Sequence, residues 1–410
     1  MSRKEALGEV DANVDTKAGT PGEVFRVFLK LGLTSFGGPI AHLGYFRDEV
    51  VVRRRWIDDA GYADLVALCQ FLPGPASSQV GFALGLMRGG PLGALAAWTA
   101  FTLPSALVLL IFAYGASAFA GTLGTGVLHG LKIVAVAVVA QAVWGMARTL
   151  APDRERAAIA VVAVLLMAIA GGALGQIGAI VLGAAAGLWL CRAAPNSAVG
   201  HLHVRISRGF GAVCLIAFVV LLAGLPVLAE AGAAGIALFD AFYRSGALVF
   251  GGGHVVLPLL QAEVVQPGWV SADAFLAGYG AAQAVPGPLF TFTAYLGAVM
   301  RPEPNGIIGA AIALVGVFLP GLLLVVGALP FWDALRTRPL AQAAMRGANA
   351  AVVGVLGTAL YDPVWTSAVH NPRDFGLALT AFVLLTVWRM PPWIVVALTA
   401  AGGVVLALAS

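Results

Sequence analysis

Apolar runs of about 20 residues recur along this chain, and a run of that length is what a helix needs to cross the hydrocarbon core of a bilayer. Only 11% of the 410 residues are charged, whereas a soluble domain usually carries about 25%. This shortage of charge excludes a soluble enzyme, a disordered chain and a nucleic-acid binder. Runs long enough for full crossings lie near 92–118, 127–147, 155–170 with its flanks, 174–191, 210–229, 306–330, 344–361, 374–389 and 391–409. We therefore predict an all-α polytopic membrane protein.

Four further apolar stretches are interrupted by glycine and proline. They are 25–46, broken at Gly37-Gly38-Pro39; 62–87, broken at Pro73-Gly74-Pro75; 239–262, broken at Gly251-Gly252-Gly253; and 274–299, broken at Pro286-Gly287-Pro288. A Pro-Gly-Pro turn cannot continue a helix, because proline lacks an amide donor and clashes with the preceding turn. We expect discontinuous or re-entrant helices here, which gives roughly nine full crossings plus four broken hairpins, or up to about 13 segments.

The interruptions recur at one spacing, which indicates an internal repeat. Phe36-Gly37-Gly38 matches Phe250-Gly251-Gly252 at an offset of 250 − 36 = 214. Gln70 and its Pro-Gly-Pro match Gln283 and the second Pro-Gly-Pro at an offset of 283 − 70 = 213. We therefore predict two related halves, the first at 22–192 and the second at 234–410.

The placement of lysine and arginine indicates that the two halves are inverted, because cytoplasmic loops are enriched in both residues. Loop 47–58 contains Arg47, Arg53, Arg54 and Arg55, whereas the matching loop 263–272 contains neither lysine nor arginine. We expect the protein to lie in an inner membrane, with the polar tail 1–21 on the cytoplasmic side. Segment 193–233 would supply a basic loop and the odd crossing that inverts the second half.

Inverted repeats with matched broken helices are typical of secondary transporters. Each break exposes half-helix N-termini, whose free amides and dipole favour an anion. Gly37, Gly38 and the three glycines 251–253 are therefore candidate anion cradles. Candidate substrate ligands beside the Pro-Gly-Pro turns are Gln70, Ser77, Ser78, Gln283 and Thr291. The alternative interpretation is that these glycines serve only close helix packing.

Several cations fall inside apolar stretches, where a charge is costly and often functional. Lys30 and Arg244 occupy equivalent positions, each six residues before a Phe-Gly-Gly. Lys132 lies early in another apolar run and matches Asn349 of the second half. These residues would balance the charge of a dianionic substrate. Alternatively, each cation reaches the membrane interface or pairs with a carboxylate.

Titratable groups near the breaks are candidates for ion coupling or for structural roles. Glu49 and Glu263 are equivalent in the two halves and would carry protons if an apolar site raised their affinity for them. A structural pairing of Glu49 with the neighbouring arginines is favoured, whereas the role of Glu263 stays open. His42 and His254 each follow a glycine break without being equivalent to one another. His254 would donate to an anion, titrate, or fill a structural role.

No known catalytic constellation or nucleotide-binding loop occurs in the sequence. Three scattered cysteines, Cys69, Cys191 and Cys214, give neither a disulfide framework nor a metal-binding pattern. We therefore expect no enzyme activity, no cofactor and no metal. Transport would be driven by an ion gradient, by the membrane potential or by exchange.

At these motifs the chain resembles the chromate ion transporter (CHR) family in its long-chain, two-domain form. The resemblance covers about residues 24 to 365, in order in both halves. It rests on Ser35-Phe36-Gly37-Gly38-Pro39-Ile40-Ala41-His42-Leu43-Gly44, on Glu49, Arg54 and Trp56, on Leu68-Cys69-Gln70-Phe71-Leu72-Pro73-Gly74-Pro75-Ala76-Ser77-Ser78-Gln79, on Phe250-Gly251-Gly252-Gly253-His254-Val255-Val256-Leu257-Pro258-Leu259, on Gln283-Ala284-Val285-Pro286-Gly287-Pro288-Leu289-Phe290 and on Gly347-Ala348-Asn349-Ala350-Ala351-Val352-Val353-Gly354.

The resemblance implies export of chromate from the cytoplasm and chromate resistance. Sulfate, another tetrahedral oxo-dianion, is the natural competitor or counter-substrate. The residues themselves indicate only an anion transporter, so a sulfate or other oxyanion carrier working inward is the nearest rival. A passive anion channel or an intramembrane enzyme is the rival from another class. The partners expected are the oxyanion and the lipid bilayer, without nucleic acid, and a homodimer is left open.

Overall fold

The chain is described by a computed structural model over residues 19–115, 121–192, 206–232, 234–250 and 252–409. Gly251 of the predicted cradle, residues 1–18 of the predicted tail and residues 193–205 of the predicted segment 193–233 lie outside these residues. Within them the chain forms helices and no strand, so the all-α prediction is confirmed. The elements up to the middle of the chain are α2 (Pro21–Thr34), α3 (Gly38–Phe46), η1 (Arg47–Arg53), α4 (Asp59–Phe71), α5 (Ala76–Gly115), α6 (Thr122–Leu150), α7 (Arg154–Ala170), α8 (Gly172–Leu190) and α9 (Arg208–Glu230).

The elements of the second half follow in a matching order, with additional short helices before and after α16. They are α10 (Ala234–Ala247), η3 (Gly253–Val255), α11 (Val256–Leu260), η4 (Gln261–Val265), α12 (Ala272–Ala282), η5 (Leu289–Thr291), α13 (Phe292–Val299), α14 (Gly306–Ala328), η6 (Leu329–Phe331), α15 (Trp332–Leu335), α16 (Pro339–Ala359), η7 (Leu360–Trp365), α17 (Pro372–Thr386) and α18 (Pro392–Leu408). Both η1 and η4 are π-helical, at positions that are equivalent in the two halves. The π-helical turns thus recur at the spacing of the sequence motifs.

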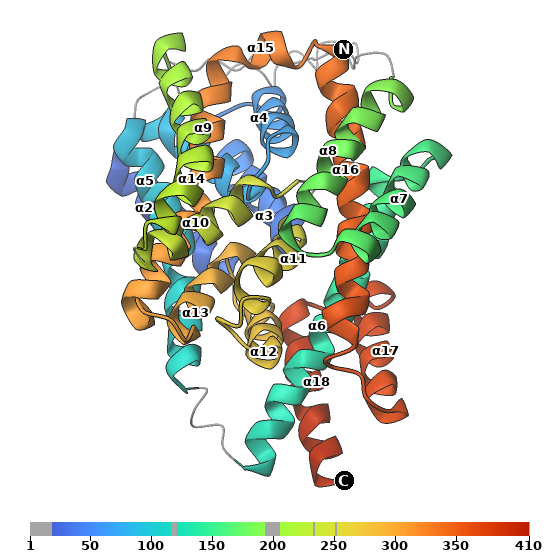
Figure 1. Cartoon of the computed structure of the whole chain (residues 1–410). Helices are drawn as coiled ribbons and strands as arrows, with labels where there is room; N and C mark the ends of the chain where they lie inside the picture. The colour runs from blue at the N-terminus through green and yellow to red at the C-terminus, as the bar shows by residue number, and fades with distance from the viewer. Residues whose placement is uncertain (1–18, 116–120, 193–205, 233, 251, 410) are drawn as a thin grey trace, which may run out of the picture.

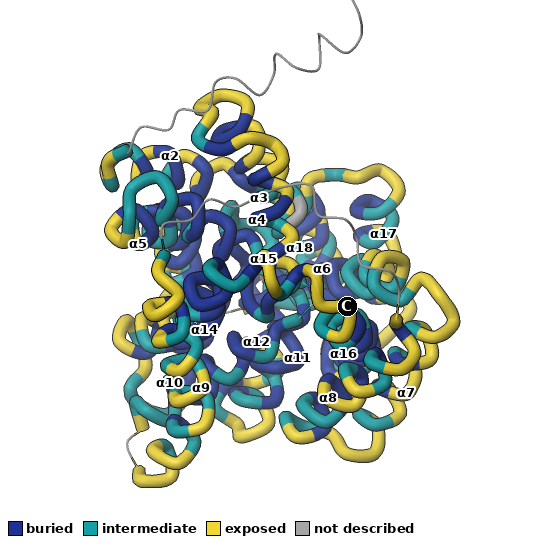
Figure 2. The backbone as a smooth tube through the Cα atoms, turned by 90° about the horizontal axis from the view of Figure 1, so that it is seen from above, coloured by how far each residue is buried: buried dark blue, intermediate teal, exposed yellow. Residues whose placement is uncertain are grey.

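Six continuous helical segments in the described residues are long and apolar enough to cross a membrane. They begin with α5, α6, α8, α9, α14 and α16. Helices α7, α17 and α18, which the sequence predicts as full crossings, have 17, 15 and 17 residues. Helix α9 is the least buried of the six and lies at the edge of the molecule (Figure 2). It exposes Val213, Ile216, Val219 and Val220, as a lipid-facing helix does.

The two halves exchange helices. Helix α6 of the first half packs against α17 and α18 of the second, and α16 packs against α7 and α8. Glycines permit the close approach at both contacts. A Cβ atom added to Gly130 of α6 would lie 2.6 Å from the Cα of Ala400, and one added to the equivalent Gly347 of α16 would lie 2.6 Å from the Cα of Gly187. Helix α6 and helix α16 are therefore each buried against helices of the opposite half.

Among the ion pairs of the described residues that join the halves, Asp64–Arg336 and Lys132–Asp273 lie toward opposite ends of the molecule. Asp64 of α4 accepts hydrogen bonds from Arg336 Nη1 and Trp332 Nε1, each 2.9 Å long. Lys132 of α6 donates to Asp273 at the start of α12, 2.8 Å away. Figure 1 shows α4 and α15 in the upper part of the view and α12 in its lower half. The glycine and proline breaks lie between these two ion pairs.

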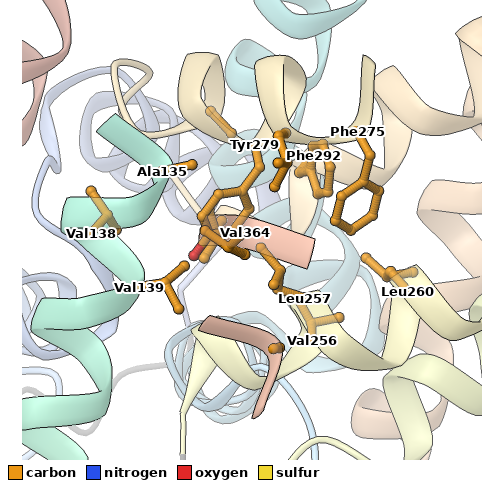
Figure 3. Close-up of a cluster of buried hydrophobic side chains, with 14 of the residues drawn as sticks. Ala135, Val138, Val139, Val256, Leu257, Leu260, Phe275, Tyr279, Phe292 and Val364 are labelled. Carbon is orange, nitrogen blue, oxygen red and sulfur yellow. The ribbon is translucent and has the colours of Figure 1, made fainter. Parts of the chain in front are cut away.

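The largest apolar core fills this middle region. It joins α6 to the second-half elements α11, α12 and α13. Figure 3 shows side chains of this cluster, among them Val139 of α6, Leu257 of α11 and Tyr279 of α12. Phe275 and Phe292 meet edge to face, with 5.2 Å between their ring centroids. This packing holds the second-half breaks against the long helix of the first half.

Candidate functional site

The first break of each half is built from glycines in the left-handed region. Gly37 has φ 97° and Gly38 has φ 78°, and in the second half Gly252 has φ 149°. A residue with a Cβ atom is strained in this region, so glycine is needed for the chain to turn there. Helix α3 starts at Gly38 with no side chain capping its amides. The first turn of α3 thus presents uncapped donors.

The second break of each half is a Pro-Gly-Pro turn between two helices. Helix α4 ends at Phe71 and α5 begins at Ala76, while α12 ends at Ala282 and η5 begins at Leu289. The central glycines have positive φ, 123° at Gly74 and 106° at Gly287. The flanking prolines are Pro73, Pro75, Pro286 and Pro288.

Each Pro-Gly-Pro turn is hydrogen-bonded to the first break of the opposite half. The amide of Gly287 donates to the carbonyl oxygen of Ser35 at 2.9 Å, and the amide of Gly74 donates to the carbonyl oxygen of Val249 at 2.8 Å. Ser35 and Val249 are equivalent residues, since 249 − 35 = 214. The two bonds are therefore copies of one contact, and each joins a break of the first half to a break of the second.

A cavity of about 60 Å³ lies where the Gly37-Gly38 break meets the two breaks of the second half. One buried water needs roughly 10–15 Å³, so the cavity has room for a small ion. Its lining combines the first-half break, α6, the second-half breaks and the start of α18: Gly37, Gly38, Val138, Gln141, His254, Ala282, Gln283, Val285, Gly287, Leu289 and Pro392. None of these lining residues is acidic.

Two polar side chains of the second half stand out in this lining. Gln283 Nε2 is buried and has no hydrogen-bond partner in the described part of the chain. A buried amide donor without a partner costs free energy of about 1–3 kcal/mol unless something accepts from it. His254 Nδ1 lies 2.6 Å from the hydroxyl of Tyr279, which leaves its other ring nitrogen for a further contact.

The structure places several predicted ligands away from the cavity lining. Gln70 is exposed on α4. Ser77 is buried, with its hydroxyl 3.4 Å from His42 Nδ1. The Ser78 hydroxyl is buried without a partner, whereas Thr291 donates to the carbonyl oxygen of Pro288 at 2.7 Å. Sequence equivalence to a helix break does not by itself bring a hydroxyl to the cavity.

The equivalent charged residues pair with one another inside each half. Lys30 Nζ lies 2.9 Å from Glu49 Oε2, and Arg244 Nη2 lies 2.9 Å from Glu263 Oε2. Arg54 also binds Glu49, at 2.8 Å. The Glu49 side chain is only 6% exposed, whereas that of Lys30 is 51% exposed. Both glutamates lie on π-helical segments, a distortion that is frequent at functional sites.

The remaining predicted pair is also separated from the cavity lining. Lys132 is bound to Asp273, as described above. Asn349 of α16 has a buried Oδ1 without a hydrogen-bond partner in the described residues. Sequence reasoning missed Gln141 and Pro392 of the lining. Neither lies in a repeated motif, and only the helix exchange brings them to the cavity.

No group of three or more His, Cys, Asp or Glu side chains that could hold a metal ion occurs in the described ranges. The three cysteines are buried and unpaired. The polar side chains of the cavity lining are thus Gln141, Gln283 and His254, and together with the backbone amides of its glycines they form a set that suits an anion.

Comparison with known proteins finds relatives along nearly the whole chain. The sequence model of a family described as chromate transporter matches residues 22–188 and 236–405. A chromate transport protein of Pseudomonas aeruginosa is 30% identical over 393 residues, covering 93% of this chain and 90% of its own. A probable chromate transport protein of Synechococcus elongatus is 26% identical, covering 93% and 95%. An uncharacterised transporter of Methanocaldococcus jannaschii is 26% identical, covering 81% and 82%. No solved structure matches.

Proposed function

Because the chain belongs to the chromate transporter family, and is therefore a multi-pass membrane protein, we propose that it exports chromate from the cytoplasm as a secondary transporter and so confers chromate resistance. Family membership confirms the resemblance found in the sequence motifs. The observation that carries the proposal is the cavity at which Gly37 and Gly38 of one half meet His254 and Gln283 of the other.

The cavity lining suits a tetrahedral dianion. Backbone amides at the start of α3 and the Gln283 side-chain amide would donate hydrogen bonds to the oxygens of the dianion. The lining contains no acidic residue that would repel the dianion. Lys30 and Arg244 would act indirectly, by holding Glu49 and Glu263 in place. Chromate would thus be bound mainly by oriented dipoles.

An inverted repeat explains how one site would open to both sides of the membrane. The paired hydrogen bonds from Gly74 and Gly287 support it, because each is the equivalent of the other. The positions of α4 and α12 toward opposite ends of the molecule support it as well (Figure 1). In this arrangement the halves are 22–192 and 234–410, and segment 193–233 connects them. The protein would lie in the inner membrane, with the tail 1–21 on the cytoplasmic side.

The membrane potential is sufficient to drive export of a dianion. Moving one charge through 100 mV changes the free energy by about 2.3 kcal/mol, and hence by about 4.6 kcal/mol for two charges. An inside-negative potential favours exit, so no nucleotide hydrolysis is needed. Ion exchange, with sulfate or protons as counter-substrate, is the alternative source of energy.

Sulfate is the second candidate substrate. Backbone amides, the carboxamides of Gln141 and Gln283 and the imidazole of His254 recognise the shape and charge of an anion, and these two properties differ little between one tetrahedral dianion and another. A sulfate carrier would use the same residues and differ in direction or preference.

Chromate flux into everted membrane vesicles tests this proposal, because eversion turns cellular export into uptake. Vesicles with an imposed inside-positive potential should take up chromate above the level of empty vesicles, and excess sulfate should inhibit that uptake. The matched control is the Gln283→Glu variant, which places a negative charge in the cavity. Uptake that is equal in wild-type, variant and empty vesicles would rule out chromate export through this site.

A further inference from the structure

The second half contains two carboxylates that share one guanidinium. Arg244 Nη2 lies 2.9 Å from Asp240 Oδ2 and 2.9 Å from Glu263 Oε2. Arg244 Nε also donates to Asp240 Oδ2, at 3.0 Å. With both carboxylates ionised, this cluster of Asp240, Arg244 and Glu263 has a net charge of −1. We refer to it as the Asp240 cluster.

One oxygen of the cluster is buried without a partner. The Asp240 side chain is 4% exposed, and its Oδ1 has no hydrogen-bond partner in the described residues. A buried ionised oxygen that accepts no hydrogen bond is unfavourable, and a second carboxylate on the same guanidinium adds repulsion. A proton on Asp240 removes both penalties, because it neutralises the excess charge.

The equivalent cluster of the first half has the opposite charge balance. There Glu49 is contacted by Lys30, Arg53 and Arg54. The residue equivalent to Asp240 is Arg26, since 240 − 26 = 214, and it is exposed. One buried carboxylate thus faces several cations in the first half, whereas two carboxylates face one cation in the second. The architecture itself does not require the second acid, because the first half is built without it.

No other charged side chain of the packed elements faces the Asp240 cluster in the described residues. Helices α8, α11 and α14 contain no charged residue. Asp273 of α12 is paired with Lys132. Helix α9 places Arg208 and Glu230 at its two ends, and its Cys214 packs in a different apolar cluster. Tyr243 of α10 donates its hydroxyl hydrogen to the carbonyl oxygen of Phe218. The charge of the cluster is therefore set by its own three residues.

We propose that the Asp240 cluster binds one proton, and that this proton strengthens binding of the dianion in the cavity. The proposal rests on the proposed function, because it needs an anion at the cavity. His254 lines the cavity, and Glu263 follows it nine residues later in one continuous helical segment, roughly 13 Å along a helix axis. At that range, removing one negative charge strengthens binding of a dianion by roughly one to two powers of ten.

The test measures chromate binding by purified protein across the alkaline pH range, where chromate remains a dianion. Wild-type affinity should fall as pH rises, by up to about tenfold per pH unit, the limit for one linked proton. Asp240→Asn removes the excess charge without changing side-chain shape. Its affinity should therefore be independent of pH and equal to that of wild type at the low end of the range. Asp153→Asn, in an exposed loop between α6 and α7, is the matched control and should keep the wild-type pH profile. Equal pH profiles in wild type and Asp240→Asn would overturn the proposal.

A second measurement separates this proposal from the proposed function. Infrared difference spectra between high and low pH should contain a protonated-carboxyl band in wild type that is lost in Asp240→Asn, whether or not chromate is bound. Retention of that band in the variant, or its absence from wild type, refutes the proton site. A wild-type protein with the band but without chromate binding would instead refute the proposed substrate. Because linkage is reciprocal, chromate added to wild type should also cause proton uptake from an indicator dye.

Discussion

The amide nitrogen of Gly287 lies 2.9 Å from the carbonyl oxygen of Ser35 and donates a hydrogen bond to it. This bond fixes the second Pro-Gly-Pro turn against the first Gly-Gly break, and both line the cavity or adjoin it. Its counterpart between Gly74 and Val249 does the same for the other pair of breaks. The geometry of the cavity thus depends on backbone that only glycine can adopt.

Replacement of Gly287 by alanine should therefore impair transport. Its φ of 106° is unfavourable for alanine by about 1–2 kcal/mol, and the new Cβ would lie 2.8 Å from Ser105 Oγ. Gly145→Ala is the control, because nothing lies within 4 Å of its added Cβ. We expect a lower melting temperature and reduced chromate flux for Gly287→Ala, and near wild-type values for Gly145→Ala. Equal flux in both variants would contradict the role given to the turn.

Substitution of Gln283 should separate lost hydrogen bonding from added charge. Gln283→Leu removes a donor to an anion, which is worth about 1.5–3 kcal/mol, or roughly a tenfold to hundredfold loss of kcat/KM. Gln283→Glu should be worse, because it repels the dianion. Gln70→Glu, at the equivalent but exposed position, should transport normally. Initial rates of chromate uptake at matched membrane levels give the order, and a Gln70 variant as impaired as the Gln283 variants would place the site elsewhere.

Neutralising the two equivalent cations should have unequal effects. In Lys30→Gln, Glu49 keeps Arg54 at 2.8 Å, and Lys30 is half exposed, so the loss should be about 1 kcal/mol or less. Arg244→Gln leaves Asp240 and Glu263 without their guanidinium, and breaking a buried pair costs about 3–5 kcal/mol. Thermal unfolding of the purified variants measures the difference. A Lys30→Gln protein that is stable but inactive would show instead that Lys30 itself contacts the substrate.

Cysteine labelling tests the inverted arrangement. Val52→Cys and Gln266→Cys introduce thiols at exposed positions in equivalent loops, and the native cysteines are buried. An impermeant maleimide should label position 52 only in everted vesicles and position 266 only in right-side-out vesicles. Labelling of both positions from one side would show that the halves are parallel.

The local structure was largely predictable from sequence, because it follows from apolar runs and from glycine and proline. The breaks at Gly37-Gly38 and at the Pro-Gly-Pro turns occur where the residues require them. The equivalence of Lys30 with Arg244 and of Glu49 with Glu263 was also visible. Their direct pairing does not follow from this equivalence, because a sequence offset shows which residues correspond and not which ones are in contact.

Contacts between distant segments could not be predicted. Nothing local to Gln141 or Pro392 marks them as cavity residues. They reach it because α6 packs against α17 and α18 across the boundary between the halves. Likewise, nothing in the sequence marks Asp240 as a functional residue. Only the structure shows its unpartnered oxygen beside the guanidinium of Arg244.

The exchange of helices also has a consequence for biosynthesis. Helix α6 is translated long before its partners α17 and α18. Helices α7 and α8 are likewise translated long before their partner α16. During that interval the glycine-lined faces of α6 and α8 lack the helices that cover them in the folded chain, so lipid or the insertion machinery must cover them. Maturation of the first half therefore cannot finish until the ribosome has completed the second.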